Sequence, residues 1–137
     1  MILFFLISLK ICLTVLFSDK TLNISLGKYL FLIPLAIFGL FHFMNAEAMA
    51  GIVPSFLPAK VVWVYLTGAA LIAAAAAVIM GKKAKLALQL LGLMLLLFAL
   101  LIWFPGAIGG DQTATSMFLK DLALAGAAWW ASKDQSD

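Results

Sequence analysis

Hydrophobic residues run along this chain in four long stretches, separated by short connections that contain polar residues, glycine or proline. The stretches cover residues 29–50, 61–80, 86–104 and 117–131. A hydrocarbon core of about 30 Å needs about 20 helical residues at about 1.5 Å each, so each stretch is long enough, or nearly so, to cross a bilayer. Backbone groups find no water there, so each stretch must be helical. The pattern predicts an all-α integral membrane protein folded as an up-down four-helix bundle.

An additional apolar segment precedes these four stretches. Residues 1–17 are short for a span and carry Lys10 near the middle, where charge is costly. The basic start and the cleavage site of a signal peptide are both missing. Three interpretations stay open: a fifth span with its N-terminus outside, an interfacial or disordered leader, or upstream sequence translated from a misassigned start. We therefore separate an N-terminal leader, 1–22, from a four-helix transmembrane domain, 23–137.

Composition supports the lipid bilayer as the principal partner. The chain is 66% hydrophobic and 11% charged, whereas soluble domains carry about 25% charged residues. The net charge of +3 does not indicate nucleic-acid binding, because the nine basic residues are all lysines and lie mostly in loops. Lys82, Lys83 and Lys85 cluster between the second and third stretches, and positive loops stay in the cytoplasm. This rule places the C-terminus in the cytoplasm as well.

Residues that bind cofactors are scarce. Cys12 is the only cysteine and His42 the only histidine. One chain therefore cannot form a disulfide, a thiolate metal site, an iron–sulfur cluster or a haem site with two histidine ligands. We expect no metal site and find no evident cofactor, although a quinone fits a membrane site.

Polar side chains gather toward the predicted outer ends of the stretches. If Ser116 caps the fourth helix, Lys120 and Asp121 lie about 6–8 Å below the surface. The other groups belong to the first two stretches, and ionisable residues inside a membrane are functional candidates by default. The candidate outer-leaflet site consists of His42, Asn45, Glu47, Tyr65, Lys120 and Asp121.

Two arrangements are open for these groups. They form a binding or proton-handling site, or they only tie helices together and reach toward headgroups. For a site, we expect His42, Asn45 and Lys120 to face the bundle interior, with Glu47 and Lys120 forming an ion pair. Since Lys120 and Asp121 point about 100° apart on a helix, one of them can face the bundle while the other reaches the headgroups.

Small residues recur every four positions in two of the stretches, a pattern that allows helices to approach closely. This predicts contact faces at Ala69, Ala73 and Ala77 and at Ala123, Ala127 and Ala131. The third stretch is rich in leucine and is expected to be the most exposed to lipid.

Three segments resemble the DoxX family of small bacterial membrane proteins: GLFHFMNAEAMAGIVPSFLP, WVYLTGAALI and FLKDLALAGAAW. The similarity covers about residues 23–131. It implies a four-helix protein of the bacterial inner membrane, associated with membrane oxidoreductase complexes.

Three functions follow. The first is an accessory subunit or scaffold of a membrane redox complex, with an oxidoreductase partner or a homo-oligomer. The second is a binder or carrier of a small apolar molecule such as a quinone. The third is a self-sufficient enzyme that uses His42 with Glu47 or Asp121 as acid–base partners. We expect the chain not to be catalytic by itself.

Overall fold

A computed structural model describes the backbone of residues 2–18 and 20–136, and the side chains of 6–14 and 25–136. The chain divides into two compact units, residues 1–34 and 35–137. The boundary falls at Pro34 inside a long helix, α2 (Lys20–Met44). Proline lacks the backbone N–H group that a regular helix uses, and its ring crowds the preceding turn. The helix therefore loses one backbone hydrogen bond at this position.

The first unit holds helix α1 (Ile2–Ser18) and the beginning of α2. α1 has 17 residues, and its described side chains are exposed. The three interpretations of the N-terminal leader stay open. Helix α2 begins at Lys20, slightly before the predicted domain boundary.

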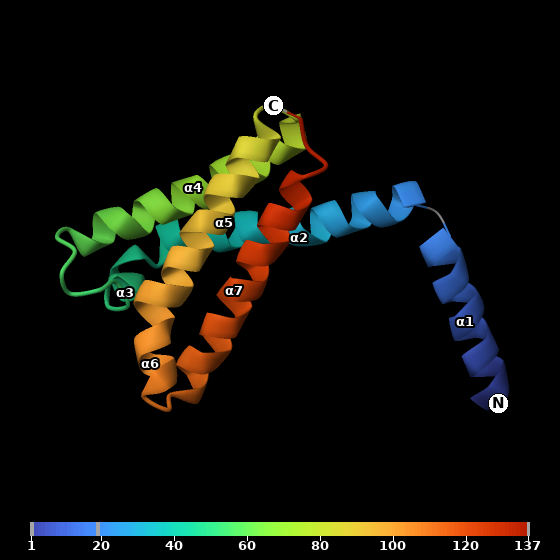
Figure 1. Ribbon diagram of the computed structural model, residues 1–137, viewed down its shortest axis with the longest axis horizontal. Coiled ribbons are helices and arrows are strands. Elements are labelled where there is room, and N and C mark those ends of the chain that lie inside the picture. The colour runs from blue at the N-terminus through green and yellow to red at the C-terminus, as the bar shows by residue number, and fades with distance from the viewer. Residues whose placement is uncertain (1, 19, 137) are drawn as a thin grey trace. The chain divides into compact units, whose positions relative to one another are not determined.

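The second unit continues from the end of α2 through five further helices (Figure 1). They are α3 (Ala46–Ala50), α4 (Lys60–Met80), α5 (Ala84–Phe98), α6 (Phe104–Ile108) and α7 (Gln112–Ser132), with a π-helical turn, η1 (Ala99–Trp103), between α5 and α6. The part of the chain that the structure describes contains no strand. The all-α prediction is confirmed.

Among the described residues, three helical segments are long and apolar enough to cross a membrane. They are Ser25–Met44, Lys60–Met80 and Ala84–Ile108. They correspond to the first three predicted stretches, which supports the assignment as a membrane protein. α7 has 21 residues like α4 but is less apolar, because it contains Lys120, Asp121 and a polar first turn.

The connection between α6 and α7 is shorter than the sequence suggested. The interval between the third and fourth predicted stretches, residues 105–116, reduces to a connection at 109–111, because α6 extends to Ile108 and Asp111 rather than Ser116 caps α7. The Asp111 carboxylate accepts hydrogen bonds from the backbone N–H groups of Thr113 at 2.8 Å and Ala114 at 3.1 Å. Ser116 lies within the helix and donates its hydroxyl to the carbonyl of Gln112. The predicted cap at Ser116 is therefore wrong.

Glycines, not the predicted alanine faces, make the closest helix contacts. A Cβ added to Gly39 of α2 would lie 2.9 Å from the Gly68 carbonyl of α4, and one added to Gly92 of α5 would lie 2.6 Å from Nε1 of Trp129 on α7. Ala69, Ala73 and Ala123 are exposed. The other three predicted alanines, Ala77, Ala127 and Ala131, are half-buried, and the fully buried positions of α4 and α7 include Leu71, Ala75, Ala125 and Ala128 instead.

α5 packs against both α4 and α7. Leu88, Leu91 and Leu95 of α5 are buried. The prediction that the third stretch is the most exposed is wrong, because a smaller share of Ser25–Met44 than of Ala84–Ile108 is buried. Its leucines face the two neighbouring helices as well as the outside.

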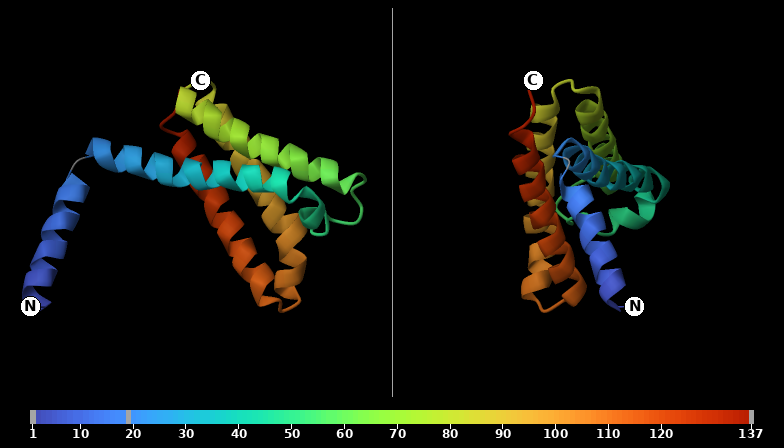
Figure 2. Two further views of the ribbon diagram at one scale, coloured as in Figure 1. Left: turned by 180° about the vertical axis from the view of Figure 1, so that it is seen from behind. Right: turned by 90° about the vertical axis from the view of Figure 1, so that its right-hand side faces the viewer.

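The helices of the second unit run in alternating directions, but α4 and α5 diverge from their connecting turn (Figures 1 and 2). The predicted up-down four-helix bundle is not confirmed. The same views place the α4–α5 turn and the C-terminus at one end, and the α6–α7 connection at the opposite end of the α5–α7 pair. Lys82, Lys83, Lys85 and Lys133 therefore lie at a common end of this unit.

Candidate functional site

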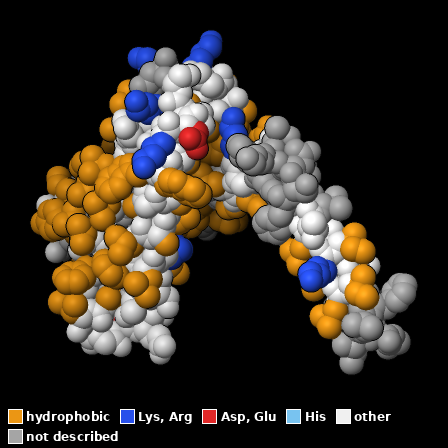
Figure 3. Space-filling model, turned by 45° about the vertical axis from the view of Figure 1, so that its right-hand side comes forward, with side chains coloured by type: hydrophobic (Ala, Val, Ile, Leu, Met, Phe, Trp, Pro, Cys, Tyr) orange, Lys and Arg blue, Asp and Glu red, His pale blue; other side chains and the backbone are white. Residues whose placement is uncertain are grey.

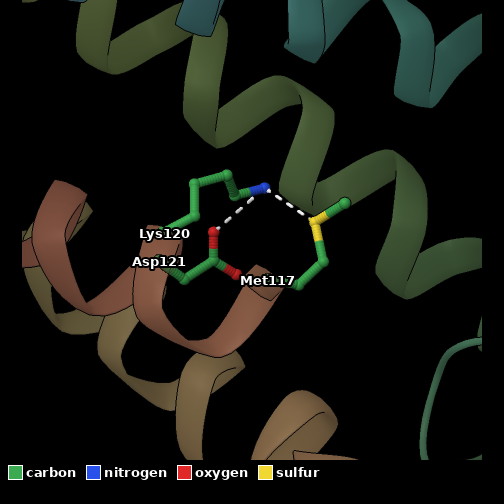
Figure 4. A network of polar contacts seen from close by, with 3 residues as sticks. All are labelled: Met117, Lys120 and Asp121. Carbon is green, nitrogen blue, oxygen red and sulfur yellow. Dashed lines mark hydrogen bonds and ion pairs between the residues drawn. The ribbon is translucent and has the colours of Figure 1, made fainter. Parts of the chain in front are cut away.

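An ion pair between adjacent residues forms the centre of the candidate site. Lys120 Nζ lies 3.3 Å from the Asp121 carboxylate, and it also donates to the Met117 sulfur at 3.4 Å (Figure 4). The Asp121 side chain is 7% exposed and the Lys120 side chain 44% exposed. The helix thus buries the acid and leaves the base at the surface, and the lysine side chain bends back to reach its neighbour. The expectation that Lys120 faces the interior is therefore wrong: adjacent residues point about 100° apart, and the residue that faces the interior is Asp121.

The pair lies deeper along α7 than predicted. Because Asp111 caps the helix, Asp121 is nine residues beyond the first residue, Gln112. At about 1.5 Å per residue this corresponds to about 14 Å along the helix axis, instead of 6–8 Å. Asp121 therefore lies near the middle of α7.

A phenylalanine ring connects the ion pair to the histidine. Lys120 Nζ lies 5.5 Å from the centroid of the Phe38 ring, a cation–π distance. The same ring packs edge-to-face on His42, with centroids 4.8 Å apart and an interplanar angle of 87°. His42 is buried, as predicted, and its Nδ1 lies 2.8 Å from the Phe38 carbonyl. A carbonyl only accepts, so Nδ1 carries a proton, and Nε2 is the nitrogen left for another partner.

Trp103 contributes the last group, from the π-helical turn. Its indole, a donor only, lies close enough to the Asp121 carboxylate to interact with its charged form. Trp103 ends η1, and Pro105 follows two residues later. Pro105 cannot donate a backbone hydrogen bond and crowds the carbonyl four residues earlier, which accounts for the widened turn. Such turns are frequent at functional sites.

The remaining predicted residues stay apart from this cluster. Asn45 is exposed and donates to the Phe41 carbonyl of its own helix at 3.2 Å, and Tyr65 packs against the Phe43 ring at 5.6 Å. Glu47 is exposed on α3. The predicted Glu47–Lys120 pair is wrong: among the described residues, Lys120 pairs with Asp121. The helix breaks at Asn45, so Glu47 lies on the separate short helix α3.

Sequence reasoning missed three residues of the cluster: Phe38, Trp103 and Met117. Two of them follow helical spacing, since Phe38 precedes His42 by four positions and Met117 precedes Lys120 by three. The sequence therefore contained a signal for Phe38 and Met117. For Trp103 the only signal was the nearby Pro105. Within the described residues, no three His, Cys, Asp or Glu side chains are grouped to hold a metal ion.

The fold and the cluster define a helical membrane protein with an ion pair and a histidine among its helices. The chain belongs to a family of unknown function: residues 32–110, more than half of the chain, match the model of the Domain of unknown function (DUF8561). The match includes His42 and Trp103 and ends before α7. No curated protein and no solved structure matches the chain.

This family assignment overturns the resemblance to DoxX. The segments that carried the resemblance are mainly apolar helix sequence. Such sequence recurs in unrelated membrane proteins because the bilayer imposes it on all of them. The oxidoreductase association that the resemblance implied loses its basis.

Proposed function

We propose that the chain is a multi-pass protein of the bacterial inner membrane in which α7 is the fourth span. α7 is long enough at 21 residues and packs along α5, one of the three apolar segments. The shared lysine-rich end supports a cytoplasmic α4–α5 turn and C-terminus, since positive loops stay inside. Hydrophobic side chains cover much of the visible surface (Figure 3).

Within the membrane, we propose a role as an accessory subunit or scaffold that docks another membrane protein. The carrying observation is the half-exposed Lys120 near the middle of α7. A charge that faces lipid at this depth is costly. The Lys120 ammonium has partners on one side only, namely Asp121, Met117 and Phe38. A polar group on a partner helix would complete its surroundings, and polar contacts hold helices together in membranes.

Site-specific crosslinking tests this role. A photo-crosslinking amino acid at Ala123, which is exposed and three residues beyond Lys120 on the same helix face, should capture one defined protein in intact cells. The same group at Ile79 of α4, also exposed, should not. Lys120→Met should abolish the crosslink, and Lys133→Gln should leave it. A crosslink to a second copy would identify a homo-oligomer; crosslinks to lipid alone would contradict the proposal.

A second candidate function is binding of a small apolar molecule such as a quinone. It is favoured by Nε2 of His42, which faces no hydrogen-bond partner among the described residues while Nδ1 is held by the Phe38 carbonyl. In the neutral ring, with its proton on Nδ1, Nε2 accepts, so it could bind the hydroxyl of a quinol, the reduced form of a quinone. Retention of ubiquinol by the purified wild type but not by His42→Ala, with unchanged thermal stability, supports this function. Equal retention by both proteins contradicts it.

A further inference from the structure

An open apolar groove of about 340 Å³ lies between α4 and α5, away from the Lys120–Asp121 cluster. Small side chains form one wall, at Ala70, Ala73, Ala74 and Ala77 of α4. The other wall belongs to α5 and includes Leu90 and Met94. The volume falls within the roughly 300–1,000 Å³ that is common for small-molecule sites. The alanines explain the groove, because α4 and α5 diverge and no large side chain fills the space.

The groove has a charged end. Lys83, at the N-cap of α5, is among its lining residues. Lys82 and Lys85 flank it, and all three lysines are exposed. Within the described part of the chain, the ion pair is Lys120–Asp121, so these lysines have no acidic partner. The apolar groove suits a hydrocarbon tail, and the positive charge at its end suits an anionic head group. A molecule that has both fits the groove.

The backbone at Lys83 holds this residue in a conformation that favours other side chains. Its φ is +51°, in the left-handed region, where glycine and asparagine are accommodated at lower cost. Gly81, two residues earlier, adopts the same region at +65°. The backbone conformation at position 83 therefore does not account for a lysine there, and we look to its side chain for the reason.

We propose that this groove binds an anionic phospholipid of the cytoplasmic leaflet. One acyl chain lies along the alanine wall, and the Lys83 ammonium contacts the phosphate, with Lys82 and Lys85 adding attraction. Basic sites between membrane helices at the cytoplasmic side are suited to anionic headgroups. A second copy of the chain is a poorer occupant, since a symmetric contact at this groove would bring two unneutralised lysine clusters together.

The test uses the full-length protein in detergent and native mass spectrometry. Dioleoylphosphatidylglycerol and dioleoylphosphatidylcholine are added at equal concentration, and the fraction of protein carrying each lipid is measured. Lys83→Asn removes the ammonium and keeps a residue that tolerates the left-handed backbone. Ala73→Leu fills the groove. The matched controls are Lys133→Gln, a lysine at the same end, and Ala69→Leu, an exposed alanine of α4 that does not line the groove.

The wild type should retain phosphatidylglycerol in preference to phosphatidylcholine. Lys83→Asn should weaken retention about fivefold, which corresponds to about 1 kcal/mol for one lysine. Ala73→Leu should abolish retention, and both controls should match the wild type. Equal retention of the two lipids, or equal losses in Lys83→Asn and Lys133→Gln, would overturn the proposal. So would a dimer that Ala73→Leu disrupts while phosphatidylglycerol binding is unchanged.

Discussion

Trp129 of α7 lies directly on Gly92 of α5. The indole N–H donates to the carbonyl of Gln89 at 3.1 Å, so the ring crosses from one helix to the backbone of the other. A Cβ at position 92 would meet Nε1 at 2.6 Å and Cδ1 at 2.7 Å. Only glycine gives the indole this position. The contact thus connects α5, inside the family match, with α7, outside it.

Gly92→Ala should therefore destabilise the protein. The added methyl must displace the Trp129 ring, and overpacking of this kind costs about 1–3 kcal/mol. The free energy of unfolding can be measured by titration with sodium dodecyl sulfate in mixed micelles. Gly126→Ala is the matched control, because no atom lies within 4 Å of its added Cβ. It should be neutral or stabilising by up to about 1 kcal/mol. Equal effects of the two substitutions would refute the contact.

The buried ion pair predicts coupling between Lys120 and Asp121. Lys120→Met leaves the buried carboxylate without its cation, so it should destabilise more than the double variant Lys120→Met with Asp121→Asn. Since Lys120 is 44% exposed, solvent screening reduces the coupling to about 1 kcal/mol. A double-mutant cycle of unfolding free energies measures it. Glu47→Gln provides the control, because its effect on the unfolding free energy should simply add to that of Lys120→Met. Coupling between Glu47 and Lys120 would instead support the predicted Glu47–Lys120 ion pair.

The hydrophobic pattern predicted the helices well and their faces poorly. α4 was expected at 61–80 and spans Lys60–Met80, because a long apolar run between prolines and glycine leaves little choice. The alanine faces failed because several small-residue rows fit helix packing equally well, and only tertiary contacts choose Gly39, Gly68 and Gly92. The spacing of small residues in the sequence does not determine which row forms the contact.

For the candidate site, too, the sequence predicted some features and not others. Burial of His42 and of one member of the Lys120–Asp121 pair followed from helical geometry and the cost of charge in lipid. The Phe38–His42 contact follows helical spacing within α2. The contact of Phe38 with Lys120 joins α2 to α7, and the participation of Trp103 depends on a widened turn; residue spacing encodes neither.

Asp111 and Ser116 offer a test of where α7 begins. Asp111→Ala removes the acceptor of two backbone N–H groups and should cost about 1 kcal/mol of unfolding free energy. Ser116→Ala removes only a hydroxyl that donates within the helix, and it should change stability by less than about 0.5 kcal/mol. Unfolding titrations of both variants give the comparison. A larger loss for Ser116→Ala would place the start of the helix at the originally predicted residue.

The last prediction concerns topology, which follows from the lysine-rich end. Cysteines are introduced singly into a Cys12→Ser background, at Lys83 in the α4–α5 turn and at Gln112 in the first turn of α7. The two positions belong to opposite ends of the α5–α7 pair. Because positive loops stay in the cytoplasm, a membrane-impermeant maleimide should label the cysteine at 112 in spheroplasts and spare the one at 83. Permeabilised cells provide the control, in which both should react. Labelling at 83 with protection at 112 would reverse the orientation, and it would move the proposed phospholipid groove to the outer leaflet.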